Sequence, residues 1–542
     1  MKFFKIGSLV FAVLMVASCT NLDLDLQDNP NAVTPDNAGL EFLFNSVQIN
    51  FADATWEAYD EPAGIVRQLA MTGGNVYDNN DSPNNFNFLW TETYANILPD
   101  IEAVLALLEG QTGVEFATGV SKTLKAYSMM TLVDLFGDVP FSDALKGSDS
   151  QNPTLDDDAA VYASALALLN EAKAHFATGE GPGSLTDIFY GGDAGQWLKA
   201  VNSLIIRYNV TTKLAGGSGS AVASAAADAI QEWSDDFDFQ YGSNRENPDA
   251  RNPYYTIDYE GDADYYQSNY FMWSLLEEKG LEDPRLRYFF YRPDCDTTDE
   301  DNFALDCPGI PRPVHYTGPY PWCIACECGY WGRDHGNNDG IPPDGFKRTT
   351  FGVYPVGGSF DADDCAELNG NGTNGALGAG ILPIASAATT DFLRAEAALT
   401  MGSGEDAREL LESGMRNSIE KVRDFGSGQA DAAFVPSDDD ISTYVNIVLN
   451  AFDGADAAGQ LDIVIKEYHI ASFGNGLDAY NNYRRTGYPS NMQPTRDPQS
   501  GEFPRLFFYP SDHVALNSNG NQRALGQQVF WDTNPANPNW VD

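Results

Sequence analysis

Residues 119–145, GVSKTLKAYSMMTLVDLFGDVPFSDAL, constrain the fold more than any other stretch of the chain. Gly137 and Pro140 mark the end of a helix, because glycine adopts the left-handed turn and proline cannot continue the helix. Before them, apolar side chains recur at steps of three and four, which is one face of an amphipathic helix: Val120, Leu124, Tyr127, Met130 and Val133. The pattern predicts a packed helix that ends at about residue 136.

Similar patterns predict further helices, both around 119–136 and in the C-terminal part of the chain. The predicted helices fall into consecutive pairs about 30 to 45 residues apart, a period typical of tetratricopeptide-like solenoids. The pairs share no single consensus, so an irregular all-helical domain remains the alternative. The predicted ranges are 37–71, 88–105, 119–136, 156–176, 195–214, 221–233, 389–399, 403–422, 460–473 and 475–489.

Between the two helical parts, residues 235–385 are rich in Gly, Pro, Asp, Asn, Tyr and Trp. Only 265–286 has a helical pattern there. The sequence therefore predicts a mainly α fold: a helical-pair scaffold over 37–234 and 386–542, completed as one domain, and a large irregular, loop-rich subdomain with few short strands. Long irregular blocks in compact domains are commonly functional or stapled by disulfides.

The N-terminus has the build of a lipoprotein signal. Two lysines precede an apolar run of about ten residues, too short to span a bilayer. Small residues then lead directly to Cys19, so we expect a signal peptide over 1–18 and lipidation of the Cys19 thiol. Residues 19–36 are polar and acidic and predict an extended tether. The alternative is an ordinary signal peptide with an incidental cysteine.

The formal charge of −47, from 31 basic and 78 acidic residues, excludes electrostatic binding to nucleic acid. Six cysteines follow Cys19, and an exported protein meets an oxidising compartment, so we expect disulfides with open pairing. A metal site on Cys323, Cys326 and Cys328 with His315 or His335 is the alternative. The six disulfide candidates are Cys295, Cys307, Cys323, Cys326, Cys328 and Cys365.

Several motifs, in order along the chain, resemble the SusD/RagB family of outer-membrane lipoproteins. They include the AYSMMTLVDLFGDVP run at 126–140, LWTETYANI at 89–97, FLRAEAAL at 392–399 and NGLDAYNNYRRTGYP at 475–489. The resemblance extends from Cys19 to about Asp532 and is weakest over 235–385. Arg484 and Arg485 belong to the last motif, and pairing with carbonyls and carboxylates explains them better than ligand binding.

The resemblance implies a cell-surface nutrient-binding protein, anchored by lipid to the outer membrane and facing the exterior. Such proteins pass oligosaccharides, or peptides in the RagB branch, to a SusC-like TonB-dependent barrel transporter. The resemblance does not identify the ligand. It implies that the protein is not an enzyme. The alternatives are a glycan-hydrolysing surface enzyme, since acidic pairs are abundant, and an adhesive or structural surface protein.

The densest aromatic stretch lies among the cysteines. Flat rings on rigid loops suit stacking on sugar rings, and a nearby arginine can donate hydrogen bonds to hydroxyl groups. The alternative is that the rings pack the stapled loops themselves. The resemblance adds the 72–87 loop, with Tyr77 and, more weakly, Asn75 and Asp78. The predicted ligand contacts are Tyr77, Tyr316, Tyr320, Trp322, Tyr330, Trp331 and Arg333.

We expect no cofactor, with calcium as the one candidate. Two acidic turns, 337–340 and 361–364, offer oxygen ligands. Neither has the spacing of a twelve-residue calcium loop, so solvated turns are the simpler interpretation. No catalytic motif and no metal-binding histidine pair was found in the sequence.

Overall fold

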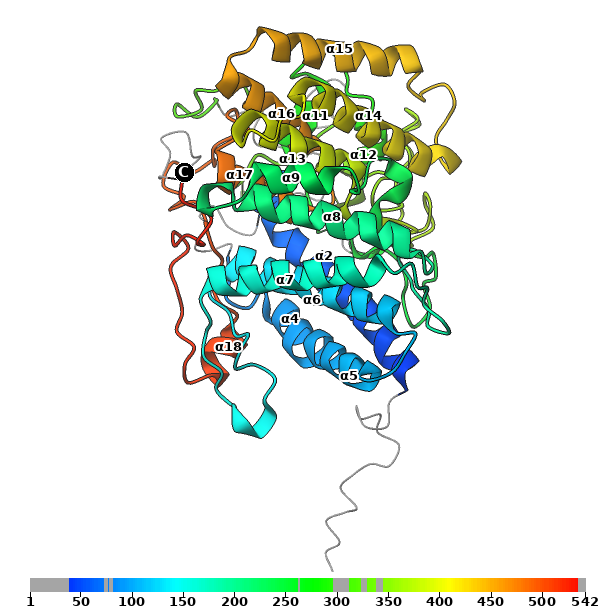
Figure 1. Cartoon of the computed structure of the whole chain (residues 1–542). Coiled ribbons are helices and arrows are strands. Elements are labelled where there is room, and N and C mark those ends of the chain that lie inside the picture. The colour runs from blue at the N-terminus through cyan, green and yellow to red at the C-terminus, as the bar shows by residue number, and fades with distance from the viewer. Residues whose placement is uncertain are drawn as a thin grey trace, which may run out of the picture.

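The computed structural model describes residues 39–72, 77, 81–261, 264–295, 311–322, 329–337 and 345–534. The predicted signal peptide, the tether and Cys19 lie outside the described residues. Helices dominate the described chain and stack on one another in layers, from α5 at one end to α15 at the other (Figure 1). The mainly α fold class is confirmed.

The first helical part matches most of the predicted ranges. The π-helical turn η2 interrupts the second predicted helix, and α9 is shorter than predicted, ending at Ala226. The elements are α2 (Leu40–Ile65), α4 (Asn87–Thr91), η2 (Glu92–Ile97), α5 (Leu98–Leu108), α6 (Glu115–Phe136), α7 (Asp158–Phe176), α8 (Ala194–Thr211) and α9 (Gly219–Ala226).

The second helical part contains two helices that lie outside the predicted ranges, α15 and the short α18. Consecutive helices pack against each other, most extensively α6 with α7 and α13 with α14. The elements are α13 (Ala387–Thr400), α14 (Ala407–Phe425), α15 (Asp438–Gly454), α16 (Ala457–Ala471), α17 (Gly476–Thr486) and α18 (Ser511–Leu516).

The irregular block begins and ends at one short sheet. Strand β1 (Phe237–Gln240) pairs antiparallel with β4 (Ile381–Ala385), and Gln240 lies opposite Ile381. The intervening chain therefore leaves and rejoins the helical scaffold at adjacent points. Its short elements are α10 (Pro253–Tyr255), η6 (Thr256–Glu260), α11 (Asn269–Leu276), α12 (Leu286–Phe289), and the paired strands β2 (Phe290–Tyr291) and β3 (Thr350–Phe351).

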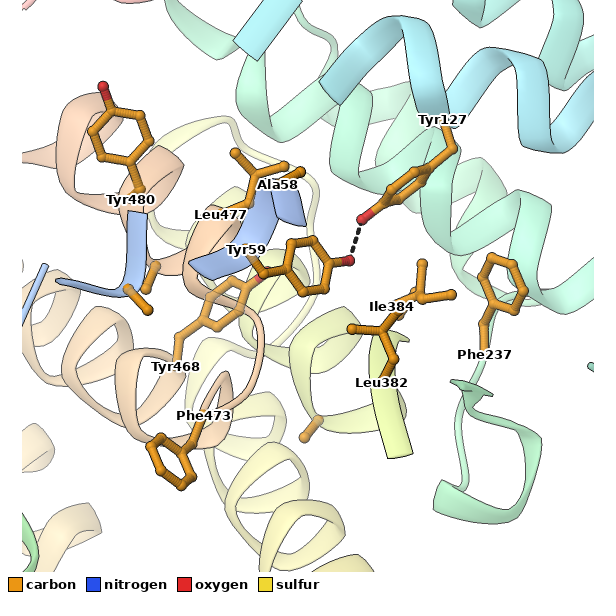
Figure 2. Packing of buried hydrophobic residues seen from close by; sticks show 14 of the residues in the cluster. Ala58, Tyr59, Tyr127, Phe237, Leu382, Ile384, Tyr468, Phe473, Leu477 and Tyr480 are labelled. Carbon is orange, nitrogen blue, oxygen red and sulfur yellow. Dashed lines mark hydrogen bonds between the residues drawn. The ribbon is translucent and has the colours of Figure 1, made fainter. Parts of the chain in front are cut away.

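All three parts share a single hydrophobic core. Figure 2 shows Tyr59 of α2 and Tyr127 of α6 with their hydroxyls 2.5 Å apart, near Phe237 of β1 and Leu382 and Ile384 of β4. All five side chains are buried. The strands that bound the irregular block are thus fixed to the helical scaffold by apolar packing.

Helix α17 lies close to α2 because a glycine begins it. A Cβ on Gly476 would lie 2.3 Å from the Tyr59 carbonyl oxygen, so a larger residue would push the helices apart. At the other end of α17, Arg484 donates to the carbonyls of Arg505 and Asp134, and Arg485 forms a bidentate pair with Glu396. The structural interpretation of the two arginines is confirmed.

Candidate ligand-binding surface

The aromatic segment 311–322 is held against a distant part of the chain. Tyr316 donates its hydroxyl to the carbonyl of Pro494 at 3.0 Å, and His315 donates Nε2 to the carbonyl of Thr495 at 2.9 Å. Gln493 donates in return to the carbonyl of Pro321 at 3.1 Å. The segment is therefore positioned by residues that follow it by more than 170 positions.

The rings of this segment pack edge to face on one another. The Tyr316 ring centroid lies 5.6 Å from that of Tyr320 and 5.5 Å from that of Trp322. Tyr316 and Tyr320 are buried, whereas Trp322 is half-buried. The guanidinium of Arg496 lies 5.8 Å from the Trp322 ring, a cation–π contact. Trp322 therefore combines accessible surface with a neighbouring hydrogen-bond donor.

Tyr77 lies in the interior, where it connects three segments. Arg67 donates to the Tyr77 hydroxyl at 3.2 Å and to the carbonyl of Gln493 at 2.8 Å, and His335 Nε2 lies 3.4 Å from the same hydroxyl. Burial and the charge of Arg67 hold the pKa of His335 well below its usual value, so this imidazole is neutral. Asn75 and Asp78 lie outside the described residues.

The remaining predicted contacts are also interior. Trp331 is fully buried, and its backbone N–H donates to Thr349 Oγ1 at 2.9 Å. Tyr330 is buried beneath Arg292, with 4.5 Å between guanidinium and ring centroid. Arg333 is buried and lies 4.8 Å from the Tyr266 ring.

Six of the seven predicted ligand contacts are therefore buried: Tyr77, Tyr316, Tyr320, Tyr330, Trp331 and Arg333. A ring that neighbouring side chains cover on both faces offers no surface for stacking. The burial favours the alternative weighed from the sequence, in which these residues pack the irregular block. Ligand contact at Trp322 stays a prediction.

One disulfide, Cys295–Cys365, staples the irregular block, with 5.6 Å between the Cα atoms. The candidates Cys307, Cys323, Cys326 and Cys328 lie outside the described residues. The alternative of a metal site needs the last three of these cysteines, so its thiol ligands also lie outside the described residues.

One of the two acidic turns that offer oxygen ligands, 361–364, lies beside this disulfide. Arg292 donates to both carboxylate oxygens of Asp361, at 2.6 and 2.8 Å, and also contacts Asp363. Arg287 donates to Asp363 at 2.9 Å. Burial disfavours the charged form, but the hydrogen bonds of both arginines lower the pKa of Asp363. Arginine side chains therefore already pair with two of the three carboxylates of this turn, and most of the other candidate turn, 337–340, lies outside the described residues.

A cleft of about 350 Å³ between α8, β1, β4 and α14 was not predicted. Its lining comes from residues between 189 and 425, so no local motif in the sequence marks it.

In the part of the chain that the structure describes, no helix is both long and apolar enough to span a bilayer. The same residues contain no group of three metal-binding side chains.

The fold matches several solved structures at low identity. A SusD homologue from Bacteroides fragilis is 19% identical with a TM-score of 0.66, and 91% of this chain and 99% of that chain are covered. A SusD/RagB protein from Bacteroides thetaiotaomicron is 19% identical with a TM-score of 0.68, covering 92% and 100%. A chitin-binding SusD homologue from Flavobacterium johnsoniae is 21% identical with a TM-score of 0.59, covering 92% and 97%. A search of curated proteins gives no significant match.

Two family profiles match the sequence itself. Residues 30–310, more than half of the chain, match the SusD-like family described as starch-binding and associating with the outer membrane. Residues 382–529 match the family of SusD and RagB outer-membrane lipoproteins. The chain therefore belongs to the SusD/RagB family.

Proposed function

We propose that this protein is a lipid-anchored, surface-exposed nutrient-binding protein that captures an oligosaccharide, or a peptide, and delivers it to a SusC-like TonB-dependent transporter. The family match over residues 30–310 and 382–529 carries the proposal. Two solved structures with the same fold are described as chitin-binding, which favours a glycan over a peptide.

The exposed part of Trp322 is the ligand contact we propose. A half-buried indole beside Arg496 combines a flat apolar face with a hydrogen-bond donor. The test is a glycan array followed by titration calorimetry of each hit, with a peptide library as the second arm. Incubation of each bound glycan, followed by product analysis, separates binding from hydrolysis. Intact ligand supports a binding protein, and shortened products would identify a glycan hydrolase.

The anchor is tested by fractionation. We expect the wild-type chain in the outer-membrane fraction and the Cys19→Ala variant in the soluble fraction. Thr20→Ala is the matched control, because it leaves the thiol in place. A Cys19→Ala variant that stays with the outer membrane would contradict the anchor.

The transporter is tested by gentle detergent extraction. We expect a TonB-dependent barrel to co-purify with the tagged lipoprotein and to be identified by mass spectrometry. An unrelated tagged outer-membrane lipoprotein from the same cells is the control. Recovery of the protein alone, under conditions that preserve other transporter complexes, would contradict the partnership.

A further inference from the structure

The cleft at the seam between the helical parts and the irregular block combines flat rings with polar groups. We name it the Trp233 cleft. It lies where η5 (Trp233–Asp235), β1 and β4 meet the N-terminal end of α8 and the C-terminal end of α14. The residues that could contact a ligand are Phe189, Tyr190, Gln196, Trp233, Gln240 and Asp424.

The aromatic wall is rigid before any ligand arrives. The Asp187 carboxylate accepts hydrogen bonds from the backbone N–H groups of Phe189, Tyr190 and Gly192 and from the indole of Trp197. Behind the wall, Tyr190 packs on Trp197 at 5.4 Å between ring centroids. Phe189 and Tyr190 are nevertheless half-buried, so part of each ring faces the cleft.

Trp233 also lines the cleft, and its turn is fixed as well. Tyr190 donates its hydroxyl to the carbonyl of Asp235 at 3.0 Å, and Lys199 pairs with the Asp235 carboxylate at 2.6 Å. Gln196 donates to the carbonyl of Ser234 at 3.3 Å. The half-buried indole of Trp233 is thus held on a short turn with little freedom to lose when a ligand binds.

The floor is a buried cluster of charged groups; burial raises the pKa of Asp236 to about 7, so the cluster is negative overall above that pH. Lys421 lies 2.7 Å from Asp236 and 2.7 Å from Asp238, and all three residues are buried. The backbone N–H of Ala387 donates to Asp236 at 2.7 Å. One lysine therefore faces two carboxylates, and the exposed Asp424 adds a third at the rim. An anionic ligand would meet repulsion here.

Volume, rings and charge together define a ligand class. A cleft of about 350 Å³ is at the lower end of the range for small-molecule sites. Its polar lining disfavours a purely apolar ligand, since Gln196, Gln240 and Asp424 would lose water without a partner. A hydroxylated ring suits both features: its CH-rich faces stack on indole and phenol, and its hydroxyls bond to Gln196, Gln240 and Asp424.

We propose that the Trp233 cleft is a second glycan subsite, which takes one uncharged or amino-bearing pyranose residue and rejects uronic acids. This inference rests on the proposed glycan-binding function and adds a site separate from Trp322.

Fluorine NMR of the full-length lipoprotein labelled with 5-fluorotryptophan, in a sugar-free detergent, tests the proposal. The chain contains nine tryptophans. The resonance that is lost in Trp233→Phe belongs to Trp233, and the resonance that is lost in Trp322→Phe belongs to Trp322. The probes are N,N′-diacetylchitobiose, the glucosamine disaccharide, digalacturonate and methylammonium chloride.

We expect the two disaccharides without carboxylates to shift the Trp233 signal in a saturable way, and digalacturonate to leave it unchanged. Trp233→Ala should weaken the affinity derived from a second cleft reporter, Tyr190 labelled with fluorotyrosine, about two- to tenfold. Gln240→Ala, at an exposed position, repeats this test if Trp233→Ala melts early.

Each contrary result has a separate meaning. Sugars that shift Trp322 but not Trp233 would overturn the subsite and keep the proposed function. An equal response to digalacturonate would overturn the charge selection, and a response to methylammonium alone would make the cleft a cation site. The absence of binding by calorimetry to these sugars and to every glycan of the array would overturn the proposed glycan function as well.

Discussion

The segment around Trp322 and the cleft around Trp233 both gather aromatic rings, yet they use them in opposite ways. In the first, Tyr316 and Tyr320 are buried and their hydrogen bonds hold the loops together. In the second, Phe189, Tyr190 and Trp233 are half-buried around a cleft. The density of aromatic residues in a sequence therefore does not reveal whether the rings are accessible.

The difference follows from what else is available to form a core. The irregular block has few helices or strands with apolar faces, so its tyrosines and tryptophans supply much of its buried surface. At the cleft, α8 and α14 already bury their own apolar faces in the core. Rings that are not required for the core can remain at the surface and line a binding site.

The largest expected effect comes from removing a buried ring. Trp331→Ala should lower the free energy of unfolding by about 3–5 kcal/mol, because the fully buried indole leaves a cavity. Urea denaturation followed by circular dichroism measures the change. Trp233→Ala, at a half-buried position, is the control and should cost less than half as much. Equal losses in the two variants would remove the contrast between the regions.

Loss of the disulfide should come next. The double variant Cys295→Ser with Cys365→Ser should lower the free energy of unfolding by about 2–4 kcal/mol, because the bond closes a separation of 70 residues. Hydrogen exchange should increase around 289–295 and 359–365. Protection in α8 and α14 should stay unchanged, and faster exchange there would show that the irregular block and the cleft unfold together.

Asp236 in the cleft and His335 in the irregular block should change the pH dependence of the free energy of unfolding in opposite directions. Burial outweighs the charge of Lys421 and raises the pKa of Asp236 to about 7, so the folded state binds a proton that the unfolded state has released. This contribution stabilises at low pH and is lost as pH rises towards 7. His335 is neutral when folded but protonated below about 6.5 when unfolded, so it destabilises as pH falls.

The two contributions oppose each other between pH 5 and 7. Relative to the wild type, Asp236→Asn should therefore make the free energy of unfolding increase more from pH 5 to pH 7. His335→Gln should make the free energy of unfolding increase less, or decrease, over the same interval. Each difference should be on the order of 2 kcal/mol. Thermal melting at several pH values measures both slopes. The exposed Asp424→Asn is the control. A change of slope in the same direction in the two variants would contradict the assignment.

The smallest expected effect is on ligand binding at the aromatic segment. Trp322→Ala should weaken binding of a screened glycan about two- to tenfold, by analogy with the energy of aromatic pairs. Calorimetry measures the affinity, and an unchanged melting temperature shows that the fold is intact. Tyr488→Ala is the control, because it removes another partly buried ring that lies outside the 311–322 segment. Undiminished affinity in Trp322→Ala would place the ligand elsewhere.

Local patterns predicted most of the helical scaffold. The apolar spacing of 119–136 corresponds to α6, which ends at Phe136 as expected from Gly137. The missed helix α15 also has a local signal: Ser437 and Asp440 form a capping box. Apolar residues then recur at helical steps, at Ile441, Tyr444, Val448 and Phe452. That helix was predictable from the sequence.

The candidate sites were less predictable, because distant residues decide which rings are accessible. Tyr316 is buried through Pro494, 178 positions further along the chain, and Tyr77 through Arg67 and His335. In the Trp233 cleft, β1 meets α14 through Asp238 and Lys421, 183 positions apart. No periodicity or motif in a single sequence encodes such pairings.

The pairing of β1 with β4 has a consequence for the length of the insert. Since the two ends of the 241–380 insert emerge side by side, the scaffold is compatible with inserts of very different length, as the entropy of closing a loop grows only slowly with its size. The insert is also held by buried contacts with the scaffold, such as the pair of Arg285 with Glu467 on α16. We therefore expect the helical scaffold to tolerate a longer or shorter insert between β1 and β4, provided that the buried contacts of the insert are kept.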